Sequence, residues 1–572
     1  MTLLTALEDR GILSAATIRL ARHLGYLYAE ENDLVIASAA AAITALSAGS
    51  VCFELDHPEQ LHSDQGCEDP LPWPPPDEWL TALRASPLVS TEPSARDKPL
   101  ILDQSSVYLT RSWAEQDGIL TWIKQRLTTT VPYEESHLAV YFTGSFELAL
   151  DAARLAASSR FSVIGGGPGT GKTTIVARIL AGMAHGRTIP LRVILAAPTG
   201  RAAACLEQAV AENLAVCETL DAANFSLHRT QGTIHRILGL KPWGGADHDS
   251  SRPLPADVIV VDEASMLSLH LMAQLLDAVA ESTQVILLGD PDQLASVEAG
   301  AVLGDLVSEE SPVPVARLSH TYRFGGAIAD LAQAIRIGDT QSALSIMKQE
   351  TPQIEWIAAD AGSATPGELA RLRHDMTTQG LALLEMGRHG QSLEALETLE
   401  SHRLLLAHRH GLSGVSYWTA LIRQWLCDET HEVLPHHWYP GMPVLITAND
   451  RLMDVYNGDS GVIISDQGSL RLAIPDTQGV RLLAPDMITS LEPLYASTIH
   501  KAQGSQYERV SLILPRSSTA LLSRELFYTG VTRAKSFLRI IGTEEAIRHA
   551  ITTEALRASG LSQKLADHTR RK

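Results

Sequence analysis

The sequence lacks several features that would each define a class of protein. It has five cysteines, and no two of them lie three positions apart. It therefore offers no spacing typical of zinc or iron–sulfur sites, and an odd cysteine count indicates reduced thiols in a cytosolic setting. Aromatic residues make up only 5% of the chain, so side chains that could stack on nucleic-acid bases cannot be placed from the sequence.

An excess of positive charge is also missing. The net charge is −20, and the first 100 residues carry 15 Asp and Glu against 6 Lys and Arg, which is −9 of that total. Nucleic-acid binding follows the local field of a groove, so an acidic total does not exclude DNA as a ligand. It does make the first 100 residues a poor grip on DNA and favours a role for them in docking a partner.

Uninterrupted hydrophobic runs of membrane-spanning length are scarce. The most apolar stretch, residues 34–53, is flanked by acidic residues and interrupted by Ser, Thr and Gly. We expect a buried helix that leads into a strand. The first residues include acids where a signal peptide has a basic segment. The sequence therefore predicts a cytoplasmic protein that does not enter the membrane.

The rest of the chain alternates between short Val- and Ile-rich runs and helical stretches, a pattern typical of buried parallel strands in an α/β fold. These runs are residues 161–164, 192–197, 257–263, 285–290, 402–408, 496–504, 509–515 and 537–542. Proline-rich residues 67–79 predict a surface connection within or after an N-terminal helical part. Residues 440–490 alternate apolar and polar positions between turn signals and predict a small antiparallel barrel.

The stretch GGPGTGKT has the spacing of a phosphate-binding loop and follows an apolar strand. Its glycines let backbone N–H groups approach phosphates, and the helix that starts there directs its positive end at the anion. Lys172 would reach the β- and γ-phosphates, and the Thr173 hydroxyl would bind Mg²⁺. The predicted nucleotide-binding residues here are Gly166, Gly167, Pro168, Gly169, Thr170, Gly171, Lys172, Thr173 and Thr174.

Two further patterns point to hydrolysis. Asp262 follows a buried strand, as a metal-binding carboxylate of such sites does, and Glu263 beside it can activate water as general base. Gln293 follows a strand that should neighbour the strand before Asp262, so it can bridge the γ-phosphate to the rest of the site. The sequence thus predicts a hydrolase that uses ATP and Mg²⁺.

An ordered set of motifs indicates which class of ATP hydrolase the chain resembles. The motifs are APTGRAAACL (197–206), TIHRILG (233–239), VVDEASM, GDPDQLASV, HTYRFGG (320–326), STIHKAQGSQYE (497–508) and LFYTGVTRAK (526–535). In this order they resemble superfamily 1 helicases, and the chain is similar to the RecD family, the alpha subunit of exonuclease V. The resemblance spans residues 160–545 and extends faintly to the N-terminus through GSVCFEL.

The resemblance implies a fold and a set of roles. The fold is α/β, with an N-terminal mainly helical partner-docking domain (1–110) and two RecA-like P-loop motor domains (111–345 and 346–572). The first motor domain carries a short pin-like insertion near 241–257, which we interpret as a loop, and the second an SH3-like β insertion near 440–490. Arg323 and Arg533 would meet the γ-phosphate as arginine fingers. Tyr322 would stack on adenine, and Gly504 and Gln506 would also contact the nucleotide.

For DNA, the resemblance implies contacts from small, hydroxylated or hydrogen-bonding residues, as the positioning of phosphates requires. These residues are Pro198, Thr199, Gly200, Arg201, Thr233, His235, Thr498 and His500. For the two histidines, a satisfied interior position is an equally good interpretation.

The chain also departs from the family pattern. Ala149 falls where relatives carry an adenine-reading Gln, so selectivity for ATP stays open, and Gln506 stands where relatives often have a ribose-binding Glu.

Three functions are compatible with these features. The first is a 5′→3′ ATP-dependent DNA helicase subunit that works with RecB-like and RecC-like partners on single- and double-stranded DNA ends in double-strand-break repair, with nuclease chemistry in another subunit. The second is a stand-alone RecD-like helicase. The third is a structural subunit with a vestigial motor.

Overall fold

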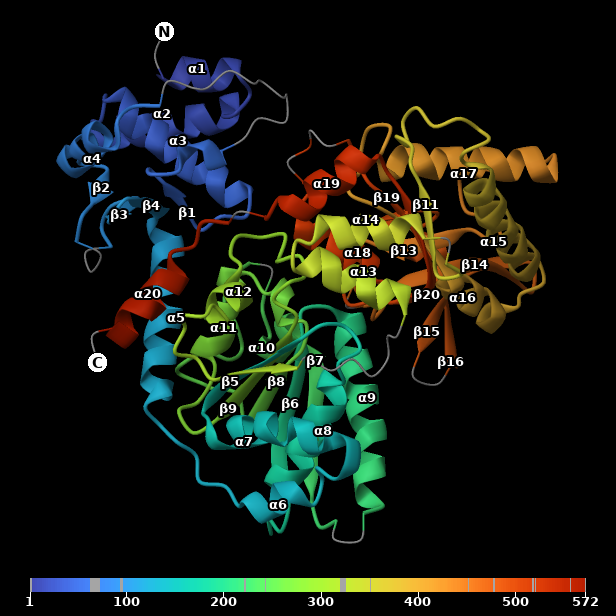
Figure 1. The fold of residues 1–572 in the computed structure, drawn as a ribbon, viewed down its shortest axis with the longest axis horizontal. Coiled ribbons are helices and arrows are strands. Elements are labelled where there is room, and N and C mark those ends of the chain that lie inside the picture. Colours follow the sequence, from blue (N-terminus) through green and yellow to red (C-terminus); the bar gives the residue numbers. More distant parts are fainter. Residues whose placement is uncertain are drawn as a thin grey trace.

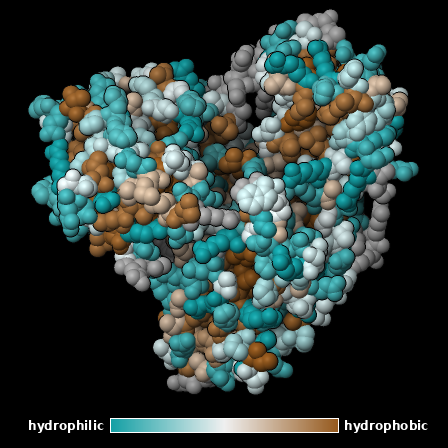
Figure 2. Space-filling view, turned by 180° about the vertical axis from the view of Figure 1, so that it is seen from behind, coloured by the Kyte–Doolittle hydropathy of each residue, from teal (hydrophilic) through white to brown (hydrophobic). Residues whose placement is uncertain are grey.

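The computed structural model describes most of the chain. The described residues are 3–61, 73–92, 96–220, 223–241, 243–318, 326–349, 351–450, 452–476, 479–516, 519, 521–555 and 557–570. The elements gather into an N-terminal unit and two α/β units, the second of which carries an antiparallel sheet (Figure 1). The surface seen from behind is of mixed hydropathy and is hollowed between the two upper lobes (Figure 2).

The N-terminal unit combines helices with a small sheet. Its helices are α1 (Leu3–Asp9), α2 (Ala15–Tyr28), α3 (Asp33–Ser47) and α4 (Pro76–Ala85), and its strands are β1 (Cys52–Glu54), β2 (Val89–Ser90), β3 (Leu100–Asp103) and β4 (Ser106–Leu109). The sheet order is β1-β4-β3-β2. Helix α3 is buried over most of its length and leads into β1, as the sequence predicted. The remainder of the sheet was not predicted, because its strands have only two to four residues.

The long helix α5 (Thr110–Leu127) leads into the first α/β unit, a parallel sheet of order β10-β5-β9-β8-β6-β7. Its strands are β5 (Phe161–Gly166), β6 (Leu191–Ala197), β7 (Leu227–Thr233), β8 (Val258–Val261), β9 (Gln284–Gly289) and β10 (Val315–Leu318). Its helices are α6 (Glu135–Ala139), α7 (Leu150–Ser158), α8 (Lys172–Ala184), α9 (Gly200–Glu218), α10 (Ile234–Leu238), α11 (Leu269–Asp277) and α12 (Val302–Leu306). Strands β8 and β9 are neighbours, which confirms the adjacency predicted for Gln293.

The second α/β unit has a parallel sheet of order β11-β20-β19-β12-β18. Its strands are β11 (Ile354–Ile357), β12 (His402–Leu406), β18 (Ser497–Thr498), β19 (Tyr507–Ile513) and β20 (Ala534–Ile541). Its helices are α13 (Ala327–Arg336), α14 (Thr340–Lys348), α15 (Ala370–Arg388), α16 (Ser392–Ser401), α17 (Val415–Thr430), α18 (Arg524–Val531) and α19 (Glu544–Thr552). Each of the eight predicted runs therefore contributes a strand to one of the two parallel sheets, but in the run 496–504 the strand is only Ser497–Thr498 and a 3-10 turn follows.

The segment predicted to form a barrel is an antiparallel sheet instead. Its strands are β13 (Pro443–Ile446), β14 (Ser460–Asp466), β15 (Ser469–Asp476), β16 (Gly479–Leu483) and β17 (Leu491–Pro493), in the order β16-β15-β14-β13-β17. Among the residues described in this segment, β16 and β17 do not pair, so the sheet stays open. The alternation of apolar and polar positions specified the antiparallel strands, but it did not specify closure, which also depends on strand stagger.

The C-terminal residues, which follow the second α/β unit, contact the N-terminal unit. After α19 the chain returns to the N-terminal unit, and α20 (Leu561–Arg570) lies beside α5 (Figure 1). The Val51 N–H donates to the Ala558 carbonyl over 2.7 Å, and the hydroxyl of Tyr108 donates to the Ser559 carbonyl over 3.3 Å. The tail thereby fastens the first and last parts of the chain to one another.

Two further expectations can be compared with the described residues. In that part of the chain no helix is both long enough and apolar enough to cross a membrane. The four cysteines that it includes, Cys52, Cys205, Cys217 and Cys427, are free thiols. Cys67 lies outside the described residues.

Candidate active site

The phosphate-binding loop lies between β5 and α8. Gly169 and Gly171 have φ angles of 77° and 79°, a conformation that only glycine adopts readily. A Cβ atom at Gly166 would lie 2.7 Å from the Thr170 hydroxyl oxygen, so the tight turn also excludes side chains there. Lys172 begins α8, and its ammonium group donates to the carbonyls of Gly166 and, over 3.1 Å, Gly167. The ammonium group thus lies over the loop itself.

Asp262 and Glu263 follow β8 and line the same cavity as Lys172. The Glu263 N–H donates to the Asp262 carboxylate over 2.8 Å. Burial and, secondarily, the charge of Glu263 raise the pKa of Asp262 to about 6, while Lys172 acts in the opposite direction. Glu263 has a φ of 51°, an uncommon conformation for a residue with a side chain that is often found at functional sites.

A cavity of about 620 Å³ contains most of the predicted nucleotide-site residues. The first α/β unit contributes Pro168, Gly169, Thr170, Gly171, Lys172, Thr173, Thr174, Arg201, Cys205, Asp262, Glu263, Gly289, Asp290 and Gln293 to its lining. The second contributes Gly504, Ser505, Gln506, Arg533 and Lys535. Gly166 and Gly167 lie at the start of the loop outside this lining. The cavity is therefore formed jointly by the two units.

A buried hydrogen-bond network at this cavity joins the two α/β units. Arg533, which is 2% exposed, donates to the side-chain oxygen of Gln293 over 3.1 Å. Gln293 in turn donates to Asp290 over 2.9 Å, and the Tyr528 hydroxyl donates to the same carboxylate over 3.1 Å. Because Gln293 and Asp290 belong to the first unit and Arg533 and Tyr528 to the second, any relative movement of the units must rearrange these bonds.

A smaller cavity of about 80 Å³ opens on the other side of the phosphate-binding loop. Its described lining mixes apolar and polar residues and comes from Gly167, Pro168, Thr170, Leu318, Ile328, Ala329, Ala332, Gln333, Arg336, Tyr528 and Thr532. Tyr322 and Arg323, for which the resemblance implied adenine stacking and a finger role, lie outside the described residues.

The residues expected to contact DNA are spread over both units at the ends of parallel strands. Pro198 and Thr199 follow β6, Thr233 ends β7, and Thr498 ends β18. The three threonine hydroxyls accept backbone N–H groups over 3.2 Å at the starts of helical turns. Such positions at the carboxyl ends of strands are where α/β proteins bind ligands.

Among the other residues expected to contact DNA, His235, His500 and Arg201 lie in different environments. His235 is exposed on α10, whereas His500 is half-buried, and burial lowers its pKa to about 4, so it is neutral at pH 7. Arg201 is half-buried, as are Thr199 and Gly200. It lines the large cavity and forms an ion pair with Glu400 of the second unit.

Several residues at the site were not singled out from the sequence. Asp290 and Tyr528 lie inside motifs that were recognised, and a carboxylate at a strand end beside Gln293 was a usable signal. Glu400 lies outside every recognised motif, and its contact with Arg201 joins positions 199 residues apart. Only the folded structure brings that pair together.

A phosphate-binding loop that faces a second α/β unit, with a buried arginine supplied by that unit, defines the class of a P-loop motor ATPase. Comparison with known proteins agrees. Family models match as an AAA domain at residues 150–359, a UvrD-like helicase C-terminal domain at 493–541 and the RecBCD enzyme subunit RecD, N-terminal domain, at 9–108.

Individual relatives narrow the class further. The RecBCD enzyme subunit RecD of Mycolicibacterium smegmatis is 42% identical over 99% of this chain and 99% of its own length. That of Mycobacterium tuberculosis is 41% identical over 98% and 96%. The ATP-dependent RecD2 DNA helicase of Deinococcus radiodurans is 30% identical over 68% of this chain and 48% of its own length. The chain belongs to the RecD family and is an ATP-dependent DNA helicase.

Proposed function

We propose that the chain is the 5′→3′ motor subunit of a RecBCD-type helicase–nuclease, which works with RecB-like and RecC-like partners on DNA ends during double-strand-break repair and recombination. The observation that carries this proposal is the cavity shared by the two α/β units, in which Gln293 of one unit meets Arg533 of the other. A site built from two units can couple nucleotide turnover to their relative movement, which a translocase requires.

The residues of the cavity suit ATP and Mg²⁺. The tight glycine turn leaves room for phosphates, and Lys172 would neutralise their charge. Thr173 and Asp262 offer hydroxyl and carboxylate oxygens, the ligand type that Mg²⁺ prefers. ATP supplies the phosphoanhydride bond whose cleavage releases energy, and Mg²⁺ offsets the charge on its phosphates.

The chain's own residues divide the work of hydrolysis. Glu263 would accept a proton from the attacking water. Arg533, with Arg323 as its expected companion, would stabilise negative charge that develops on the phosphoryl group. The bond from Arg533 to the side-chain oxygen of Gln293 places the guanidinium at the cavity where the phosphoryl group would lie.

The smaller cavity suits the nucleobase. The apolar side chains of its lining offer a flat ring a place to pack, and Gln333 is one of several polar side chains there, with an amide that can hydrogen-bond a base edge. Gln333 would then take over the reading that an upstream Gln provides in relatives and that Ala149 cannot provide. We therefore propose ATP as the preferred nucleotide.

The match to relatives favours a subunit over a stand-alone helicase. Full-length similarity extends to RecD subunits, whereas the similarity to the Deinococcus helicase spans about half of that protein. The acidic N-terminal unit supports docking on a partner and not on DNA. The intact set of Lys172, Asp262 and Glu263 argues against a vestigial motor.

An unwinding assay on the co-purified complex tests direction. Duplexes with a 5′ or a 3′ single-stranded tail would be offered to wild-type complex and to complexes in which only this chain carries Lys172→Gln. We expect the substitution to remove unwinding from the 5′ tail and to leave unwinding from the 3′ tail in place. Loss confined to the 3′ tail would refute the proposed polarity.

A further inference from the structure

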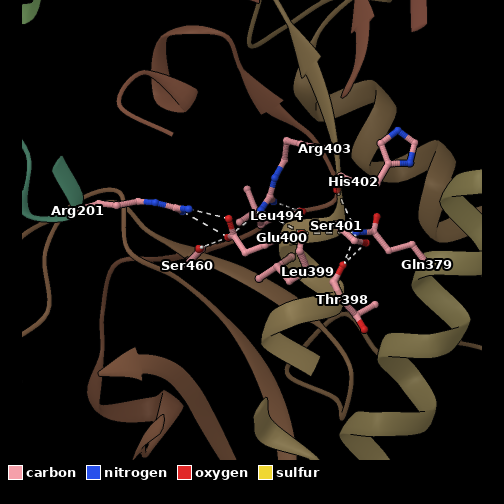
Figure 3. Close-up of polar contacts among 10 residues, drawn as sticks. All are labelled: Arg201, Gln379, Thr398, Leu399, Glu400, Ser401, His402, Arg403, Ser460 and Leu494. Atoms are coloured by element: carbon pink, nitrogen blue, oxygen red, sulfur yellow. Dashed lines mark hydrogen bonds and ion pairs between the residues drawn. The ribbon is translucent and has the colours of Figure 1, made fainter. Parts of the chain in front are cut away.

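An ion pair links the two α/β units at the edge of the nucleotide cavity. Arg201 lies in the first turn of α9, and Glu400 lies near the end of α16 (Figure 3). Two guanidinium nitrogens of Arg201 meet the two carboxylate oxygens of Glu400 at 2.6 and 3.3 Å. Such two-point pairing is geometrically specific as well as strong.

Glu400 also contacts two other elements. The Ser460 hydroxyl, at the start of β14, donates to the carboxylate over 3.4 Å, and a guanidinium nitrogen of Arg403, in β12, lies 3.6 Å from it. Burial tends to raise the pKa of Glu400, but Arg201 and then Arg403 outweigh it and hold that pKa below its usual value. One charged carboxylate therefore joins the first unit, the second unit and the antiparallel sheet.

Arg201, which the first unit contributes to this ion pair, is well placed to transmit movement between the units. Arg201 lines the cavity that holds Lys172 and Glu263. Together with Thr199 and Gly200, it also belongs to the residues expected to contact DNA. A Cβ atom at Gly200 would lie 3.3 Å from Tyr456, so the segment between β13 and β14 packs against the same helix start. The start of α9 is thus held from the second unit at two points.

We infer that Glu400 is a positioning residue for the helicase reaction: through Arg201 it sets the start of α9 against the second unit, so that turnover in the cavity moves the DNA-contacting segment. Glu400 itself is not part of the cavity lining, and among the residues expected to contact DNA it is paired with Arg201. The inference rests on the proposed motor function, and it adds a residue that lies outside the recognised motifs.

The test is Glu400→Gln, which keeps the shape of the side chain and removes its charge. ATP hydrolysis would be measured with and without single-stranded DNA, together with base pairs unwound per ATP. We expect hydrolysis without DNA to match wild type, whereas stimulation by DNA and base pairs per ATP each fall at least about fivefold, the lower end of typical coupling effects. Glu432→Gln, which breaks an exposed ion pair with Arg388 inside the second unit, is the matched control and should match wild type.

A double-mutant comparison keeps the inference falsifiable if Glu400→Gln proves unstable. If the pair acts as a unit, Arg201→Gln with Glu400→Gln should lose no more coupling than the worse single variant. Losses that multiply would overturn the inference, as would wild-type coupling in Glu400→Gln. Wild-type chain without any DNA-stimulated hydrolysis, alone or in its complex, would instead refute the proposed motor function, and the inference with it.

Discussion

At the scale of single residues, the site is defined by side chains whose positions are fixed by contacts within the chain. Lys172 lies over its own loop, and Arg533 is held by Gln293. In the proposed mechanism, the residues that would bind the phosphates differ from the residues that would act on the reaction. A substitution in the second group should slow turnover without a comparable loss of nucleotide affinity.

Arg533→Lys tests that separation. Lysine keeps the positive charge but cannot reproduce the planar set of donors that reaches Gln293, Ser505 and Thr529 together. We expect DNA-stimulated kcat to fall about 100-fold or more, within the range for removal of such electrostatic stabilisation, with a much smaller change in KM for ATP. Arg548→Lys, in an exposed pair on α19, is the control. A kcat near that of wild type would contradict the role of Arg533.

At the scale of elements, a buried polar cluster around His402, in the parallel sheet of the second unit, should make the free energy of unfolding depend on pH. His402, at the start of β12, forms a hydrogen bond with the Ser511 hydroxyl over 3.0 Å. Its charged neighbours are three arginines, Arg403, Arg509 and Arg539, and one carboxylate, Asp375, whose effect on the histidine pKa opposes theirs. Burial first, and the arginines after it, lower the pKa of His402 from 6.5 to about 3.

The sign of the resulting pH dependence follows from linkage. The unfolded chain binds a proton at His402 near pH 6.5 and the folded chain only near pH 3, so stability falls as pH falls between these values. At pH 5 the loss relative to pH 7.5 should be about 2 kcal/mol. His402→Asn should remove that part of the slope, which denaturant unfolding at a series of pH values would measure. An unchanged slope would show that His402 is not the group that titrates.

The elements also show which parts of the fold the sequence could predict. Strands β5, β6, β8, β9, β12, β19 and β20 are apolar and buried, so composition alone marks them. Strands β7, β10 and β11 were missed because they are short or largely polar strands at sheet edges, where burial does not constrain composition. The phosphate-binding loop was predictable because its chemistry lies in eight consecutive residues. The pairing of Arg201 with Glu400 was not, because it depends on how two units pack.

At the scale of the whole molecule, the C-terminal tail connects the motor units to the N-terminal unit. Gly560 has a φ of 67°, and a Cβ atom there would lie 2.2 Å from the Tyr108 hydroxyl. The tail can therefore follow its path only with glycine at this position. The carbonyls of Ala558 and Ser559 accept from Val51 and Tyr108, and the Ala558 N–H donates to the Ser50 hydroxyl, which completes the attachment.

Gly560→Ala should release this attachment. We expect destabilisation of about 1–3 kcal/mol from the backbone conformation alone, with the clash against Tyr108 added to it, and faster proteolysis of the C-terminal tail. Gly411→Ala separates the two effects, since Gly411 has a φ of 83° with open space around it. If the two variants show equal tail proteolysis and equal melting temperatures, the contact with Tyr108 does not hold the tail.

We propose that nucleotide turnover in the cavity between the two units drives movement on DNA. The most direct measurement is ATP hydrolysis by the purified chain and by its co-purified complex, each with and without single-stranded DNA, for wild type and Lys172→Gln. We predict hydrolysis that DNA strongly stimulates and that Lys172→Gln abolishes. Hydrolysis that is indifferent to DNA in both preparations, or that survives Lys172→Gln, would contradict the account.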